Sequence, residues 1–329
     1  MGIEDVVVKV NPDLTGLPDP WKESTLRSIV ERLRVAGLRV VGLEGDPFDM
    51  APIKRYGEEE VEGEGGGGQR REIALSHYRE LLESMAKLDI HLLCYNFMVG
   101  PGWSRTGVRP VRGGALATYF NKTEYEAAYA QTSQTSQILR LTKDQVWSNY
   151  EYFLKAVMPT AEKVGIRMGL HPDDPCLPEL GGYARIFETV ADFDRAYSIC
   201  PGESNAVTYC QANFKLMGAD LVETARHFGR RIAFIHVRDV EGDKTDFTEL
   251  FHDQGTTDQF ELMRTYRELG LDVPLRGDHV PEMEGDQLLT ADCVPGYFTM
   301  GRLFANGYIR ALLKGTAEDG RSASQGCGA

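Results

Sequence analysis

The sequence predicts an α/β protein of the TIM (β/α)8 barrel type. Short apolar runs with the length of buried strands alternate with longer stretches whose apolar residues recur at helical spacing. Strands that alternate with helices of this length form a parallel sheet, and this many units favours closure into a barrel. Seven strands are readable where a complete barrel has eight, so we expect the first strand to be absent or replaced.

The predicted elements follow one another along most of the chain. Strands are expected in VVVKV near residue 8, LRVVGLEG, HLLCYNFM from His91, IRMGL before His171, AVTY before Cys210, RIAFI before His236 and VPLRG before Asp278. Helices are expected between them in WKESTLRSIVERLRVAG, IALSHYRELLESMAKLD, DQVWSNYEYFLKAVMPTAEKVG, ADFDRAYSIC, ADLVETARHFG and DQFELMRTYRELG.

Three segments break this alternation. Residues 57–71 combine an acidic cluster with four consecutive glycines, which favours a mobile surface loop. Residues 100–143 form a long stretch rich in Gly, Thr, Ser and Gln, which we interpret as a loop that serves as a substrate lid or is disordered. Residues 316–329 are expected to be a disordered tail, so residues 1–315 would form a single barrel domain.

Composition excludes several classes of protein. The chain of 329 residues has a formal net charge of −13, whereas binding to nucleic acid or anionic membrane depends on Lys and Arg. The start MGIEDVVVKV is unlike a signal peptide, and no apolar run reaches the roughly 18 residues of a membrane span. Six scattered cysteines are typical of cytosolic thiols. We therefore expect a cytoplasmic protein that acts on a small polar substrate.

Metal-capable side chains stand at the carboxyl ends of four successive predicted strands. They are His171, Cys210, His236 and Asp278. In a β/α barrel these strand ends meet at one face, where active sites are built. Two imidazoles, a thiolate and a carboxylate at that face could converge on one divalent metal ion.

Each of these four residues also has an ordinary explanation. A single Cys at the end of a buried strand is often a small core residue. Backbone carbonyls could satisfy the two histidines, and Asp278 could cap the following helix. The metal hypothesis therefore depends on the joint placement of the four side chains.

Two residues beside the candidates carry further chemistry. Arg238 lies two residues after His236 and shares its side of the strand. It could hold a substrate carboxylate, or it could form a salt bridge with Asp239 or another acid. His279 directly follows Asp278 and could donate or accept a proton beside the metal.

Several motifs occur together in an order that resembles one family. They are HPDDP at residues 171–175, CYNFM at 94–98, WSRT at 103–106, the IHVRD segment, GDH at 277–279 and PGYFTMGRLFANGYIRAL from residue 295. Together they resemble D-mannonate dehydratase of the metal-dependent, xylose-isomerase-like barrel type. The similarity runs from about residue 3 to residue 314.

The resemblance implies a set of functional residues. The family binds one divalent ion, usually manganese, through a His, a Cys, a His and an Asp, which fall on the four strand-end residues named above. Its acid/base pair, a His beside the Asp ligand and a Tyr in a Pro-Gly-Tyr turn, falls on His279 and Tyr297. By position, Asn96, Arg105 and Arg238 correspond to substrate-binding groups.

The chain departs from the family pattern at a few places. Gly277 and Val280 replace the Pro and the Gly of Arg-Pro-Asp-His-Gly, and Cys176 replaces the last proline of HPDDPP. The family's first strand and its aromatic residues precede the point where this sequence begins. These changes leave the expected metal-binding residues in place and concern the wall around the substrate.

The implied activity is that of a metal-dependent hydro-lyase of hexuronate catabolism. The leading case is dehydration of D-mannonate to 2-keto-3-deoxy-D-gluconate, in which a cation stabilises the enediolate, a base removes the proton and an acid assists loss of the hydroxyl. The sequence does not assign these two roles between His279 and Tyr297. By softness, the thiolate favours Zn2+, Fe2+ or Co2+, whereas the resemblance implies Mn2+.

Two other functions remain open from sequence. A sugar isomerase or epimerase on the same barrel would assemble several carboxylates around its metal, whereas the four strand ends offer one. A catalytically inactive metal-binding paralogue is the second alternative, against which the presence of His279 and Tyr297 argues. An unpaired edge beside the first readable strand also leads us to expect a homo-oligomer.

Overall fold

The computed structural model of the chain describes residues 2–58, 62, 66–132, 140–289 and 293–325. The chain divides into two compact units, one formed by residues 2–103 and 128–208 and the other by residues 104–127 and those from 209 onward. In the described parts of the chain, no helix is both long and apolar enough to cross a membrane.

A seven-stranded parallel sheet has its strands in the order β1-β2-β3-β6-β9-β10-β13. The strands are β1 (Asp5–Val8), β2 (Arg39–Glu44), β3 (Leu92–Tyr95), β6 (Arg167–Leu170), β9 (Asn205–Cys210), β10 (Ile232–Val237) and β13 (Leu275–Gly277). Their order in the sheet follows their order in the chain, which is the topology of a β/α barrel. The predicted α/β barrel-type fold and its seven strands are confirmed.

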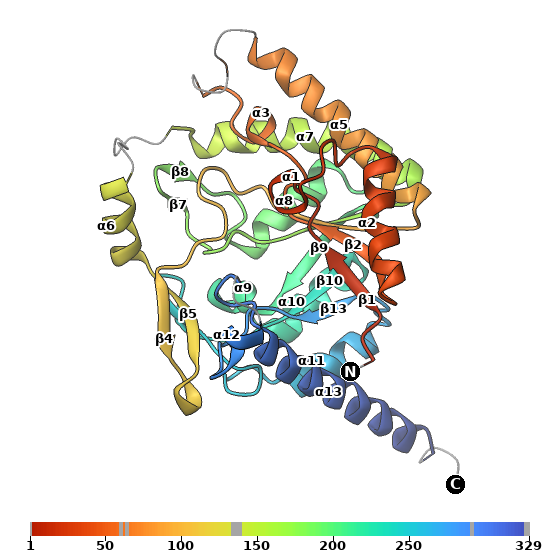
Figure 1. Ribbon diagram of the computed structural model, residues 1–329, viewed down its shortest axis with the longest axis vertical. Helices are drawn as coiled ribbons and strands as arrows, with labels where there is room; N and C mark the ends of the chain where they lie inside the picture. Colours follow the sequence, from red (N-terminus) through yellow and green to blue (C-terminus); the bar gives the residue numbers. More distant parts are fainter. Residues whose placement is uncertain (1, 59–61, 63–65, 133–139, 290–292, 326–329) are drawn as a thin grey trace. The chain divides into compact units, whose positions relative to one another are not determined.

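The unit formed by residues 2–103 and 128–208 contains most of the predicted helices of the N-terminal half. Its helices are α1 (Pro12–Thr15), α2 (Glu23–Val35), α3 (Ala51–Lys54), α5 (Gly67–Lys87), α7 (Lys143–Val164) and α8 (Val190–Ile199), and β7 (Glu179–Leu180) pairs with β8 (Tyr183–Ala184). Helices α5 and α7 lie side by side (Figure 1). They pack through Tyr78 and Phe153, whose rings meet edge to face at 5.0 Å.

Local sequence explains where α7 begins and which face it buries. Thr142 caps the helix by accepting a hydrogen bond from the backbone of Gln145, whose side chain accepts one from the Thr142 backbone in return. Val146, Tyr150 and Val157 are fully buried, at the spacing of one helical face. The predicted helix is therefore fixed by its cap and by its apolar stripe.

The unit formed by residues 104–127 and 209 onward contains β10, β13 and a four-stranded antiparallel sheet. That sheet has the order β11 (Val240–Asp243), β12 (Asp246–Glu249), β5 (Leu116–Asn121), β4 (Gly107–Pro110). The helices are α9 (Gln211–Leu216), α10 (Leu221–Phe228), α11 (Gln259–Glu268), α12 (Asp286–Leu289) and α13 (Thr299–Gln325), with two short 3-10 turns, η1 (Arg112–Gly114) and η2 (Gly229–Arg231).

Residues 100–143 contain more regular structure than the loop expected from sequence. Strands β4 and β5 form a hairpin, seen in yellow in Figure 1, and α6 (Lys122–Thr132) follows it directly. The hairpin turns at Gly113, whose φ of 70° suits glycine. Strand β5 pairs with β12, more than a hundred residues later, and such a long-range partner cannot be read from local pattern. Residues 133–139 lie outside the described residues.

The segment 57–71 also differs from the expected surface loop. Helix α5 begins at Gly67, so the last five residues of the segment are helical. Glu58 is buried, because its carboxylate pairs with Arg55 at 2.6 Å and with Arg140 at 3.0 Å. These ion pairs hold the backbone at Glu58 in place, although the composition of the segment predicted a mobile loop. Residues 59–61 and 63–65 lie outside the described residues.

The C-terminal tail was expected to be disordered from residue 316, whereas α13 continues to Gln325. Thr316 is buried and accepts a hydrogen bond from Nε of Arg267 at 2.9 Å. This contact with α11 holds the helix beyond the point where the sequence becomes polar. Cys327 lies outside the described residues.

Strand β13 packs directly against α13 because Gly277 has no side chain. A Cβ at this position would lie 2.7 Å from Cβ of Ala305, 3.1 Å from Nε2 of the buried His252 and 3.5 Å from Cδ1 of Ile309. Ala305, His252 and Ile309 occupy the space beside the strand. Asp278 directly follows this tightly packed position.

We expect Gly277→Ala to lower the free energy of unfolding by roughly 1–3 kcal/mol, the usual cost of overpacking a tight core site. Chemical denaturation would measure this change. Gly307→Ala is the matched control, since Gly307 lies on the same α13 with nothing within 4 Å of an added Cβ. That change should stabilise the helix by about 1 kcal/mol. Native stability of Gly277→Ala would contradict the packing described here.

Candidate functional site

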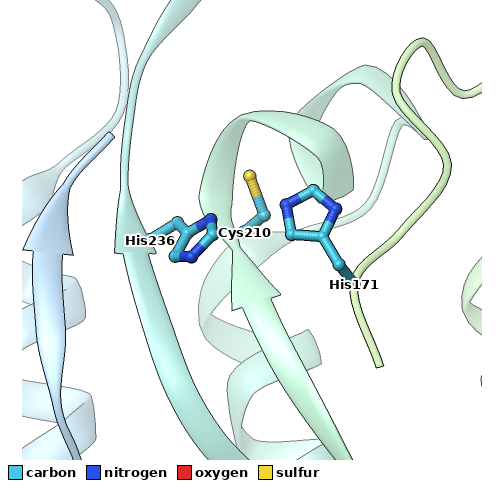
Figure 2. A group of neighbouring side chains, drawn as sticks. All are labelled: His171, Cys210 and His236. Carbon is cyan, nitrogen blue, oxygen red and sulfur yellow. The ribbon is translucent and has the colours of Figure 1, made fainter. Parts of the chain in front are cut away.

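Three of the four predicted metal-binding side chains lie together. One ligand atom from each of His171, Cys210 and His236 lies within 4.8 Å of the other two. Figure 2 shows the two imidazole rings flanking the Cys210 side chain. His171 directly follows β6, Cys210 ends β9 and His236 lies near the end of β10, so neighbouring parallel strands deliver all three. Two imidazoles and a thiol at this spacing could bind a single ion.

Hydrogen bonding orients the His171 ring. Its Nδ1 lies 2.7 Å from the carbonyl oxygen of Pro172, which can only accept. Nδ1 therefore donates, and Nε2 keeps the lone pair that a metal ion requires. Such a bond on the second ring nitrogen is the usual way in which a metal-binding histidine is held.

The fourth predicted ligand, Asp278, lies beside this group without belonging to it. Its Oδ2 is 3.4 Å from Nδ1 of His236, and its Oδ1 accepts a hydrogen bond from Nη2 of Arg276 at 3.0 Å. Burial alone would raise the pKa of Asp278, but His279, Arg276 and His236 outweigh it and hold the pKa well below its usual range. The carboxyl group is therefore ionised next to Nδ1 of His236.

Glu44, Cys94 and His236 form a second group whose ligand atoms meet the same 4.8 Å distance. Glu44 ends β2 and is the register partner of Cys94 in β3. Glu44 was not predicted, although it stands at the carboxyl end of a predicted strand as the other candidates do. Because the two groups share His236, they are competing sites for one ion.

The predicted acid/base residues form a hydrogen-bonded pair. Nε2 of His279 lies 3.0 Å from Oη of Tyr297, and the rings meet edge to face with centroids 5.3 Å apart. His279 has a φ of 44°, in the left-handed region that is uncommon for a side chain of this size. Its two neighbours hold this conformation through backbone hydrogen bonds. The N–H of Asp278 donates to the carbonyl of Val237, and the N–H of Val280 donates to the carbonyl of Gly296. Strained backbone of this kind is frequent at functional sites.

A buried carboxylate, Glu249, lies behind this pair and was not predicted. Its Oε1 is 2.9 Å from Nδ1 of His279, 2.6 Å from Nη2 of Arg105 and 2.6 Å from Nη2 of Arg238. Burial alone would raise the pKa of Glu249, but the positive charges of Arg238 and Arg105 and the hydrogen bond from His279 outweigh it and hold the pKa well below its usual range. Glu249 is therefore ionised although it is only 1% exposed.

The antiparallel sheet explains how these residues meet. Tyr119 of β5 pairs with Gly107 of β4 on one side and with Thr248 of β12 on the other. Arg105 precedes β4 and Glu249 ends β12, so the two side chains reach each other across the sheet. Glu249 shares the buried face of β12 with Phe247. A Glu on the apolar face of an alternating strand is the signal that could have identified it.

Arg238 was expected to bind substrate or to pair with a nearby acid, and its contacts are those of the second alternative. It is fully buried and donates from Nε and Nη2 to the carboxylate of Glu249 at 2.8 and 2.6 Å. Its Nη1 also donates to Sγ of Cys210 at 3.5 Å. The other suggested partner, Asp239, binds Lys215 at 2.5 Å. Arg238 thus connects the thiol of the metal group to Glu249.

Asn96, the third predicted substrate-binding residue, lies in a separate polar cluster. Its Oδ1 accepts hydrogen bonds from Nζ of Lys54 at 3.0 Å and from the backbone of Met98 at 3.1 Å. The same ammonium group binds both carboxylate oxygens of Asp46, at 2.7 and 2.8 Å. Asp46 and Asn96 follow β2 and β3, so this cluster also stands at carboxyl ends of strands.

Comparison with known proteins identifies one family. The sequence model described as D-mannonate dehydratase (UxuA) matches residues 21–140 and 131–322. A mannonate dehydratase from Enterococcus faecalis is 28% identical over 96% of this chain and 91% of its own length. One from Brachyspira hyodysenteriae is 26% identical over 97% of this chain and 93% of its own length.

Solved structures show the same fold. The crystal structure of mannonate dehydratase from Streptococcus suis serotype 2 has a TM-score of 0.81 at 22% identity, covering 97% of this chain and 89% of that chain. An L-ribulose 3-epimerase structure has a TM-score of 0.56 at 12% identity, covering 98% of this chain and 88% of that chain.

Proposed function

Because this chain belongs to the D-mannonate dehydratase family, we propose that it is a hydro-lyase that converts D-mannonate to 2-keto-3-deoxy-D-gluconate. The observation that carries the proposal is the hydrogen-bonded pair of His279 and Tyr297 beside the ionised Asp278. This pair can move protons next to a cation, as dehydration requires. An isomerase or epimerase is not favoured, since the epimerase structures share only the fold.

We propose that His171, Cys210, His236 and Asp278 hold one divalent metal ion. The donor set fits, because three ligand atoms lie within 4.8 Å of one another and an ionised carboxylate adjoins them. When bound, the cation would stabilise the negative charge that develops on the substrate next to its carboxylate. Manganese is the proposed ion, and the thiolate also suits Fe2+, Co2+ or Zn2+.

The chemistry assigned to the protein itself is proton transfer. The proton on the carbon next to the carboxylate must be removed, and the hydroxyl on the following carbon must leave as water. His279 and Tyr297 are the proposed base and acid, and their 3.0 Å hydrogen bond allows a proton to pass between them after each turnover. Two groups in direct contact can therefore return to their starting state without a further residue.

The proposed substrate-binding residues are Asn96, Arg105 and Arg238. Asn96 is partly exposed and offers its amide next to the buried Lys54, whose positive charge would attract a carboxylate. Arg105 and Arg238 donate hydrogen bonds to Glu249, so they would contribute to substrate binding mainly through their positive charge.

Three further features belong to the proposal. Residues 100–143 act as a lid that excludes water, consistent with the place of Arg105 in the Glu249 cluster. The second feature is a cytoplasmic location. The third is assembly into a homo-oligomer, because β1 is an edge strand of the sheet and the backbone groups of an unpaired edge tend to pair with another chain. A stable monomer in light scattering at micromolar concentration would contradict this assembly.

Activity is the first test. The protein incubated with Mn2+ and D-mannonate should yield a 2-keto-3-deoxy acid, detected by a colorimetric assay and by NMR. His279→Asn and Tyr297→Phe should each lower kcat on the order of 10²–10⁴-fold, since each removes one proton-transfer group. Tyr152→Phe is the control, because Tyr152 is 44% exposed and bonds to Glu72. The absence of product from D-mannonate and from a panel of other aldonic acids would exclude the proposed function.

The metal site is tested by paired cysteine variants. Cys210→Ser should weaken binding of Mn2+ while leaving the fold intact, because a hydroxyl is a poorer metal ligand than a thiolate. Cys94→Ser is the matched buried control, since Cys94 belongs to the competing group and accepts a hydrogen bond from Thr208 at 3.2 Å. Isothermal titration calorimetry would compare the two affinities. Loss of binding in Cys94→Ser alone would assign the ion to the Glu44 group instead.

A further inference from the structure

We propose that Glu249 is a positioning residue that keeps the ring proton of His279 on Nδ1, so that Nε2 is the proton acceptor and Tyr297 the proton donor. The inference deepens the proposed function and rests on it for the roles of His279 and Tyr297. It assigns a part to a buried acid that lies outside the metal group.

The contacts of Glu249 require this arrangement of protons. An ionised carboxylate only accepts hydrogen bonds, so every group that faces Glu249 must present a proton to it. Arg105 and Arg238 do so from four N–H positions at 2.6–3.1 Å. Nδ1 of His279, 2.9 Å from Oε1, must therefore carry a proton as well. An unprotonated Nδ1 would turn its lone pair toward an anion.

Two further contacts compete with this assignment. Oδ2 of Asp278 lies 3.6 Å from Nε2 of His279, beyond hydrogen-bond length, whereas Oε1 of Glu249 lies 2.9 Å from Nδ1, so Glu249 is the nearer acceptor for the ring proton. Nη2 of Arg105 lies 3.3 Å from Nδ1 of His279 and could donate to it only if that nitrogen were unprotonated. The same Nη2 lies 2.6 Å from Oε1 of Glu249, so its proton has a nearer and charged acceptor. The Arg105 contact is therefore secondary, and the two arginines serve to keep Glu249 ionised.

The tautomer assigns the two catalytic roles. In a neutral imidazole with its proton on Nδ1, Nε2 holds a lone pair and can only accept. Tyr297 Oη, 3.0 Å away, must then donate its proton to Nε2 in the resting state. In turnover, His279 removes the proton next to the substrate carboxylate, and Tyr297 gives its proton to the departing hydroxyl, which leaves as water. The proton on His279 then returns to the Tyr297 oxygen, which restores both residues.

Nitrogen NMR of the metal-loaded protein tests the tautomer directly. The protein would carry 15N-labelled histidine and Zn2+, a diamagnetic ion, and the His279 signals would be identified by their loss in His279→Asn. We expect a protonated Nδ1 and an unprotonated Nε2 in the wild type. A proton on Nε2, with or without one on Nδ1, would overturn the proposal. Because this NMR measurement needs no turnover, its result does not depend on whether D-mannonate is the substrate.

Steady-state kinetics of Glu249→Gln provide the second test of the proposal. An amide can present its NH2 group to Nδ1 and so favour the wrong tautomer, which should lower kcat on the order of 10²–10⁴-fold. The loss of kcat is the diagnostic result, because Glu249 also holds Arg105 and Arg238, the proposed substrate-binding groups, through which KM can change as well. Glu249→Asp keeps the charge and should recover part of kcat. Unchanged kcat in Glu249→Gln would contradict the proposal.

Glu58→Gln is the matched control for loss of a buried charge. Glu58 also lies between two arginines, Arg55 and Arg140, and its other partner is Tyr183. This variant should lose stability as Glu249→Gln does, while kcat and the His279 nitrogen signals stay as in the wild type. An equal loss of kcat in Glu58→Gln would show that the loss in Glu249→Gln comes from lower stability, and it would contradict the proposal. If Glu249→Gln does not fold, the wild-type nitrogen spectrum decides.

Discussion

The parallel arrangement of seven strands is the constraint on which the candidate site depends. Parallel strands place their carboxyl ends at the same edge of a sheet, so residues far apart in the chain become neighbours there. His171, Cys210 and His236 come from three successive strands in the order of the sheet, and their ligand atoms lie within 4.8 Å of one another. No local motif could achieve this, because more than sixty residues separate the first from the last.

A second sheet supplies the charges behind the proposed acid/base pair. The antiparallel strands β4, β5 and β12 bring Arg105 and Glu249 together, and β10 contributes Arg238 from the position just after its end. A buried carboxylate is costly unless it is paired and hydrogen-bonded, and Glu249 meets both conditions through two guanidinium groups and an imidazole. The parallel sheet thus provides the proposed metal group, and the antiparallel sheet orients the residue to which we assign proton transfer.

The sequence was sufficient where short-range pattern decides the structure. Apolar runs identified all seven parallel strands, and helical spacing identified α2, α5, α7, α8, α10 and α11. It was insufficient where distant segments pair. Strand β5 depends on β12, and Glu249 depends on Arg105 and Arg238, so neither the hairpin nor the buried acid was predicted. Glu58 likewise became buried through Arg140, which composition alone could not indicate.

The most direct test of this account is the location of the metal ion. Anomalous diffraction from crystals of the manganese-loaded protein would show the ion as a single peak. We expect that peak among His171, Cys210, His236 and Asp278, with His279 and Tyr297 adjacent to it. A peak bound by Glu44 and Cys94, or one that lies away from His236 altogether, would contradict it.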